Sequence, residues 1–205
     1  DALLKESLRN MFVKHYSSGK FIYFPILENE RAVGFAEFIN ILKIAMHLEL
    51  SGSIEENFSL SAYSNSSGEN DLVFMLKTNA QSETFAGMVK WEDKMPEDLT
   101  PLLPDKTKEE ILFIQNSFLS ENNFSSTTLP DLISATATPK NIPILNSSKY
   151  LFQDKLINNI DTRVLRSKND ETIILYGFFA GKYLVITTSE EAFKNTINRL
   201  KISLE

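Results

Sequence analysis

The stretch "LVFMLKTNAQSETFAGMVKW", from Leu72 to Trp91, joins two kinds of hydrophobic pattern. An apolar run of strand length comes first and ends at Thr78, and an amphipathic segment with the only Trp of the chain follows. A second version, "LVITTSEEAFKNTINRL" (Leu184 to Leu200), repeats the order strand, Thr, helix near the C-terminus. The recurrence predicts two places in the fold where a strand leads directly into a helix.

Both copies carry a Thr followed three residues later by Gln or Glu. Thr78 is followed by Gln81, and Thr188 by Glu191. This spacing is typical of a capping box, in which the Thr oxygen and the Gln or Glu side chain satisfy free backbone N–H groups at a helix start. Two explanations for the recurrence stay open: an internal duplication, or independent use of the same strand-to-helix join.

Hydrophobic periodicity predicts the remaining elements. Helices are expected at 2–16, 31–48, 79–95, 106–120 and 189–204, and strands at 21–27, 58–63, 71–78, 156–167, 172–179 and 182–188. Because the strands gather beside helices without strict alternation, we expect an α+β fold with antiparallel sheet and packed helices. Two pseudo-repeated lobes, each ending in a strand–capping box–helix unit, are one version of that fold.

The chain divides by composition into three parts. We expect an N-terminal α+β lobe at 1–120, a Ser/Thr/Pro-rich connection at 121–141, and a C-terminal β-meander plus helix at 142–205. With 205 residues, of which 42% are hydrophobic, the chain can bury a sizeable core. The two lobes are therefore expected to pack together as one unit.

The composition argues against several classes of function. The chain has 21 Lys and Arg against 27 Asp and Glu, a net charge of -6, which disfavours nucleic acid as a partner. It has no Cys, which excludes disulfides, thiolate metal sites and a Cys nucleophile. No apolar run approaches the roughly 20 residues that span a bilayer. The sequence begins with Asp rather than Met, so we expect a trimmed or processed chain, in which any upstream signal or anchor would not be visible.

One acidic cluster is the strongest candidate for chemistry. It lies beside the only Trp of the chain and comprises Trp91, Glu92, Asp93, Glu97 and Asp98. Paired carboxylates next to an aromatic ring suit glycosidase-type acid–base work. A solvated helix end is the simpler interpretation, because acids in a first helical turn are stabilised by the helix dipole. We therefore keep the five residues as candidate binding residues and assign no catalytic residue.

Other chemical signatures are weak. His15 continues an apolar helix face and His47 lies near a helix end, and their spacing predicts no zinc site. No phosphate-binding glycine loop and no nucleophile elbow occurs in the sequence. The sequence thus predicts no metal site, no cofactor and no enzymatic activity.

Two segments resemble a family of uncharacterised proteins from candidate-phylum bacteria. They are "LVFMLKTNAQSETFAGMVKWEDKMPEDLTPLL" and "FQDKLINNIDTRVLRSKNDETIILYGFFAGKYLVITTSEEAFKNTINRL", which together cover about 80 of the 205 residues. Members of that family typically carry an N-terminal membrane segment and an extracytoplasmic globular part. The resemblance implies a membrane-tethered, extracytoplasmic protein whose anchor is missing from this chain. It implies no activity and no functional residues.

These observations lead to three hypotheses. The first is a non-catalytic interaction or structural module that contacts a protein partner in the cell envelope. The second is a ligand-binding or sensory domain with an aromatic-lined pocket of several hundred Å³. The third is an enzyme that uses the carboxylates beside Trp91.

Overall fold

The computed structural model describes residues 2–28, 30–46, 48–123 and 149–204. Its strands are β1 (Phe21–Tyr23), β2 (Leu27–Glu28), β3 (Arg31–Ala32), β4 (Ile54–Ser64), β5 (Asn70–Thr78), β6 (Phe152–Ile157), β7 (Ile160–Arg166), β8 (Thr172–Phe179) and β9 (Tyr183–Thr187). Its helices are α1 (Ala2–Val13), α2 (Phe35–Leu42), α3 (Leu48–Gly52), α4 (Gln81–Trp91), α5 (Met95–Asp98), the short 3₁₀ helix η1 (Thr100–Leu102), α6 (Asp105–Asn123) and α7 (Glu190–Leu204).

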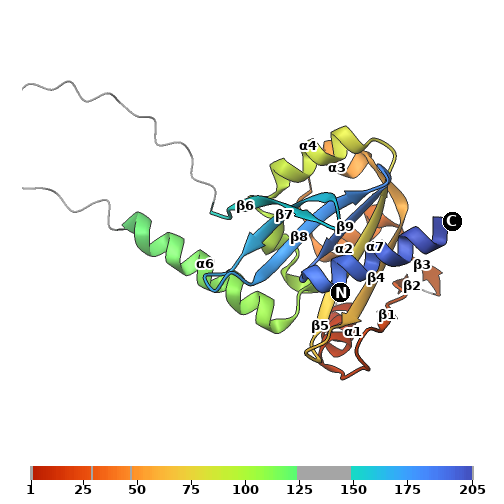
Figure 1. The fold of residues 1–205 in the computed structure, drawn as a ribbon, viewed down its shortest axis with the longest axis horizontal. Helices are drawn as coiled ribbons and strands as arrows, with labels where there is room; N and C mark the ends of the chain where they lie inside the picture. Colours follow the sequence, from red (N-terminus) through yellow and green to blue (C-terminus); the bar gives the residue numbers. More distant parts are fainter. Residues whose placement is uncertain (1, 29, 47, 124–148, 205) are drawn as a thin grey trace, which may run out of the picture.

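Seven of the strands form one antiparallel sheet in the order β1-β4-β5-β9-β8-β7-β6, and β2 pairs with β3 (Figure 1). This architecture confirms the predicted α+β fold with an antiparallel sheet and packed helices. The pairing of β5 with β9, from Val73 opposite Thr187 to Lys77 opposite Tyr183, joins strands of the two expected lobes in one sheet. Most of the connection expected at 121–141 lies outside the described residues.

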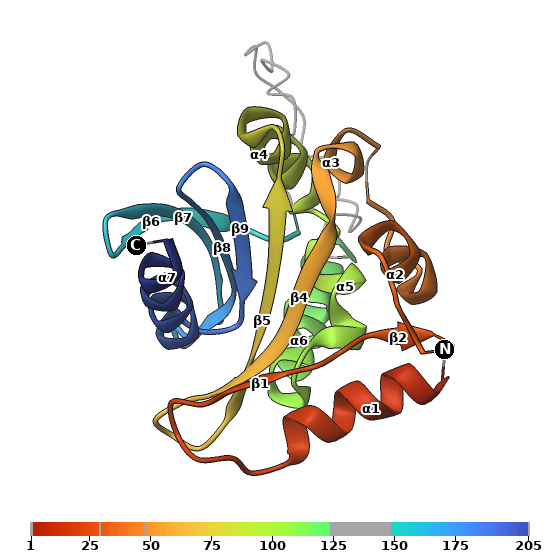
Figure 2. The same ribbon diagram turned by 90° about the vertical axis from the view of Figure 1, so that its right-hand side faces the viewer.

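Helices cover both faces of the sheet. Figure 2 shows α7 on one side and α2, α5 and α6 on the other. Along β5, Phe74 and Leu76 pack in the core cluster on the side of α2, α4 and α6, whereas Val73 packs with Phe193 of α7. Because side chains alternate along a strand, a strand that is buried on both faces is apolar at successive positions. This explains why the run that begins at Leu72 is continuously apolar.

The first predicted capping box is wrong. Helix α4 begins at Gln81, and its N-cap residue Ala80 makes no side-chain cap bond. The Thr78 hydroxyl instead accepts a hydrogen bond from Ala80 N (3.1 Å), donates to Ser53 O (2.9 Å) and contacts the hydroxyl of Thr84. Thr78 is therefore the buried end of β5, and tertiary partners satisfy its hydroxyl.

The second predicted capping box is displaced by one residue. Ser189 Oγ accepts a hydrogen bond from Ala192 N (3.1 Å), so Ser189 rather than Thr188 caps α7. Glu191 turns away from the cap and accepts hydrogen bonds from Ser66 N (3.1 Å) and Tyr63 Oη (3.0 Å). Since α4 and α7 pack in different core clusters, the two units also differ in their surroundings. The internal duplication stays a prediction.

Replacing Ser189 by Ala is expected to lower the free energy of unfolding by about 1–2 kcal/mol, because α7 loses its N-cap. Gln81→Ala is the matched control and is expected to change stability by less than about 0.5 kcal/mol, because Gln81 is exposed and closes no capping box. Urea unfolding followed by circular dichroism measures both values. Equal losses in the two variants would argue for the capping box at α4 after all.

The strand expected at 156–167 is also wrong, because it contains a hairpin. Asn158 and Asn159 have φ angles of 53° and 61° and form the turn between β6 and β7. Asn tolerates the left-handed conformation that two-residue hairpin turns require, so the pair Asn-Asn was a usable signal. The hairpin predicted at Ala180 and Gly181 is confirmed, with φ angles of 53° and 66°.

Candidate functional site

The side chain of Trp91, the centre of the predicted acidic cluster, lies in the protein core. Only 1% of Trp91 is exposed, and its indole N–H donates a hydrogen bond of 2.8 Å to Asp98 Oδ2. Buried indoles need such an acceptor, because an unpaired N–H in the core is costly. Asp98 thus anchors α5 to the end of α4.

Glu92 belongs to a buried ion pair. It is 7% exposed and accepts two hydrogen bonds from Arg163 on β7, from Nε at 2.8 Å and from Nη2 at 2.7 Å. Tyr176 Oη on β8 donates a third bond of 2.7 Å. The hydrogen bonds with Glu92 hold the pKa of Arg163 above its usual value, and burial together with Glu92 raises the pKa of the Tyr176 phenol. The carboxylate therefore joins α4 to the sheet.

The other two acids have separate surroundings. Glu97 accepts hydrogen bonds from Lys149 and from Tyr150 Oη. Burial opposes its ionisation, but the hydrogen bond and charge of Lys149 outweigh this effect and lower the pKa of Glu97. Asp93 is exposed just after α4. Glu92, Glu97 and Asp98 thus have different hydrogen-bond partners. The role of the four acids of the cluster in binding stays a prediction.

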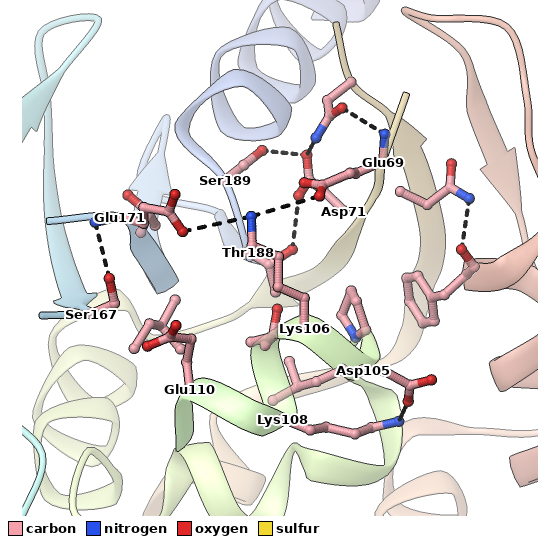
Figure 3. A pocket seen from close by; sticks show the side chains of 18 of the residues that line it. Glu69, Asp71, Asp105, Lys106, Lys108, Glu110, Ser167, Glu171, Thr188 and Ser189 are labelled. Atoms are coloured by element: carbon pink, nitrogen blue, oxygen red, sulfur yellow. Dashed lines mark hydrogen bonds and ion pairs between the residues drawn. The ribbon is translucent and has the colours of Figure 1, made fainter. Parts of the chain in front are cut away.

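A pocket of about 600 Å³ lies in a different part of the fold (Figure 3). Its walls come from the end of α1, the β4–β5 turn, the start of α6, the β7–β8 turn and the start of α7. Apolar contacts come from residues such as Phe12, Leu103 and Ile173. The acidic side chains in the lining outnumber the lysines by six to two; they are Glu69, Asp71, Asp105, Glu110, Glu171 and Glu190, against Lys106 and Lys108.

Asp71 is the buried carboxylate of this pocket, with 8% of the residue exposed. Ser189 Oγ donates to its Oδ2 at 2.6 Å, Asn65 Nδ2 to the same oxygen at 3.1 Å, and Thr188 Oγ1 to Oδ1 at 3.3 Å. Burial raises the pKa of Asp71, and these neutral donors only partly offset the effect. No ion pair among the described residues includes Asp71.

The neighbouring Asn70 has a side-chain oxygen that is an unused hydrogen-bond acceptor among the described residues. It is 7% exposed and also lines the pocket. Its Nδ2 donates to the carbonyls of Phe12 (3.0 Å) and Lys14 (2.7 Å), which fixes the end of α1. Within the part of the chain that the structure describes, its Oδ1 is buried without a hydrogen-bond partner. Such an orphan acceptor is unusual in a folded protein and needs an explanation.

Lys106 is the central cation of the pocket. Figure 3 shows it reaching from the first turn of α6 to lie between Glu69 and Glu171. Its Nζ is 3.6 Å from a carboxylate oxygen of each, and the three side chains are 55–58% exposed. Burial opposes the charge, but the two carboxylates outweigh it and raise the pKa of Lys106. An ammonium group therefore already occupies the space between the two acids.

Sequence reasoning missed this pocket. Its residues come from five separate segments, and no motif links them. His15, which the sequence placed on a helix face, lies in the pocket lining and is exposed; His47 lies outside the described residues.

Metal binding has no support in the described ranges, where no three His, Asp or Glu side chains come close enough to hold an ion. Known proteins also supply no assignment. No family model, curated protein or solved structure matches the chain.

Proposed function

We propose that this chain is a non-catalytic ligand-binding module and that the pocket beside Asp71 is its binding site. The volume of about 600 Å³ falls within the range of small-molecule sites, which combine an apolar lining with a few placed polar groups. Asp71 lies on β5 and Ser189 at the start of α7, whereas Glu69 and Glu171 lie in the turns between strands. The pocket that supports this proposal is lined by polar and aliphatic side chains, and Phe12 is the aromatic residue among Phe, Tyr and Trp in the lining.

Asp71 is the observation that carries the proposal. A charged carboxylate is costly to bury without a positive partner. Part of the cost is offset by Ser189, Asn65 and Thr188, and these bonds also fix the start of α7. A structural link of this kind needs no cavity beside it, whereas a binding site needs both the cavity and an acceptor in its wall.

The test uses a variant that fills the pocket from its exposed side. Val13 lines the pocket and is 63% exposed, so Val13→Trp adds bulk there without disturbing the core. Val89 on α4 is 42% exposed and outside the lining, which makes Val89→Trp the matched control. Both proteins and the wild type are screened by ¹H–¹⁵N NMR against small cationic, anionic and neutral metabolites.

We expect at least one metabolite to bind the wild type and Val89→Trp alike, and to bind Val13→Trp about tenfold more weakly or not at all. Absence of any binder, or binders that Val13→Trp does not affect, would rule out this pocket as the functional site.

A contact with a protein of the cell envelope is the second candidate. Leu112 and Leu119 on α6 are 55% and 60% exposed and lie seven positions apart, which places them on the same side of the helix. The extracytoplasmic location and the membrane tether are proposals that rest on the resemblance described above. Within the described ranges, no helix combines the length and apolar character needed to cross a membrane.

A further inference from the structure

We propose that the ligand of this pocket is a small organic cation, a primary ammonium group on an apolar body, and that it takes the place of Lys106 between Glu69 and Glu171. This inference rests on the proposed function and adds the chemical class of the ligand. It follows from the charges, from the weakness of the Lys106 contacts and from the unused acceptors in the wall.

The first step is the distribution of charge. Within the lining, Asp105 pairs with Lys108 at 2.9 Å, and Glu190 is held by Lys155 and Arg166 from outside the pocket. Of the remaining carboxylates in the lining, Glu69 and Glu171 share the ammonium of Lys106, and Asp71 and Glu110 form no ion pair among the described residues. Such a site repels anions and attracts a second positive charge.

The second step is that Lys106 can be displaced at little cost. Both of its ion pairs are 3.6 Å long, and more than half of each participating side chain is exposed. Exposed ion pairs of this kind contribute little to stability. A ligand ammonium that forms direct hydrogen bonds with the same carboxylates makes shorter and stronger contacts.

The third step is the pair of underused acceptors. Asp71 Oδ1 accepts one long bond, 3.3 Å from Thr188 Oγ1, and Asn70 Oδ1 accepts none from the described residues. Both residues line the pocket and are more than nine-tenths buried. Asn70 Oδ1 itself has almost no exposed surface, so a donor of the ligand reaches it only when the side chains around it shift. An ammonium group carries three donors and no acceptor, and it can therefore donate to both oxygens.

The fourth step distinguishes an organic cation from a metal ion. In the described part of the chain no three acidic or His side chains approach closely enough for metal coordination. The carboxylates are spread around a cavity of about 600 Å³ whose other contacts include Phe12, Leu103 and Ile173. An alkyl chain fits these apolar side chains, and a hydrated point charge does not.

The experiment compares three six-carbon probes that differ in their polar end: n-hexylamine, n-hexanol and n-hexanoate. Isothermal titration calorimetry of the wild type at neutral pH and low salt measures each affinity. We expect hexylamine to bind about tenfold more tightly than hexanol, and hexanoate to bind more weakly than either, since the site is negative. Added NaCl screens the attraction between an ammonium group and the carboxylates. We therefore expect it to weaken the binding of hexylamine and to leave the binding of hexanol unchanged.

Two variants test the site itself. Lys106→Met keeps the length of the side chain and removes its charge, so hexylamine is expected to bind about fivefold more tightly. Glu69→Gln with Glu171→Gln is expected to weaken hexylamine about tenfold and to leave hexanol unchanged. Lys90→Met is the control, because Lys90 forms an equally exposed ion pair with Glu49 outside the pocket.

The outcomes separate the two proposals. Equal affinities for hexylamine and hexanol, or no response to Lys106→Met, would overturn the cationic ligand. If the metabolite screen then finds a neutral or anionic compound that Val13→Trp excludes, the binding function survives without this ligand class. If neither experiment finds a ligand, both proposals fall.

Discussion

Replacing Arg163 by Met is expected to lower the free energy of unfolding by about 3–5 kcal/mol, the cost of removing one partner from a buried ion pair. Glu92 is 7% exposed, and Arg163 gives it two of its three hydrogen bonds. In the variant the carboxylate keeps only the bond from Tyr176. Urea unfolding at neutral pH measures the loss.

A matched pair of controls isolates burial as the cause. Arg31 also contacts both carboxylate oxygens of one acid, Glu37, through its Nη2 at 2.8 Å, but its side chain is 64% exposed, so Arg31→Met is expected to cost less than about 1 kcal/mol. Adding Glu92→Gln to Arg163→Met removes the stranded charge and should restore about half of the loss. If Arg163→Met costs no more than Arg31→Met, Glu92 is not held as described and returns as a candidate for binding.

Trp91→Ala is expected to destabilise the protein by about 3–5 kcal/mol, because it removes a large side chain from a core that does not refill the space. Trp91 is 1% exposed and packs in the same cluster as Met88, Met95 and Leu99. Circular dichroism must follow the unfolding, because Trp91 is the only Trp of the chain and the variant has no indole fluorescence.

Trp91→Phe separates packing from hydrogen bonding. The smaller ring keeps most of the buried contact, but Asp98 loses the N–H that donates to it at 2.8 Å. We expect a loss of about 1–2 kcal/mol, well below that of the Ala variant. A Trp91→Ala protein of unchanged stability would contradict the core position and restore the functional interpretation of the acidic cluster.

The sequence predicted the elements whose signals are local. The strand expected at 71–78 is β5, from Asn70 to Thr78, and the helix expected at 79–95 contains α4, from Gln81 to Trp91. The first is a continuous apolar run of strand length, and the second has helical periodicity. The predicted capping boxes were wrong because a hydroxyl group forms hydrogen bonds with its neighbours in space, which the local spacing of residues does not reveal. The partner of Thr78 is Ser53, which lies 25 positions away along the chain.

Local sequence patterns could not predict the pocket or the ion pair between Glu92 and Arg163. Glu92 and Arg163 are 71 positions apart, and Asp71 and Ser189 are 118 apart. Composition and spacing do not reveal which of many acids meets which base or hydroxyl after folding. Glu92 was predicted as a candidate binding residue, and in the structure its partners Arg163 and Tyr176 bind the end of α4 to the sheet; its role in binding stays a prediction.

The central pairing of β5 with β9 has a consequence for how the chain folds as it is made. The hairpins β4–β5, β6–β7, β7–β8 and β8–β9 each join neighbours in sequence and can form as soon as they are synthesised. The edge of β5 that pairs with β9, however, stays unpaired until residues 183–187 have been synthesised, far along the chain from β5. Until then the unpaired backbone N–H and C=O groups along this edge of β5 can pair with another nascent chain. We therefore expect the yield of folded protein to depend on how long this edge stays unpaired during synthesis, as well as on the stability of the finished fold.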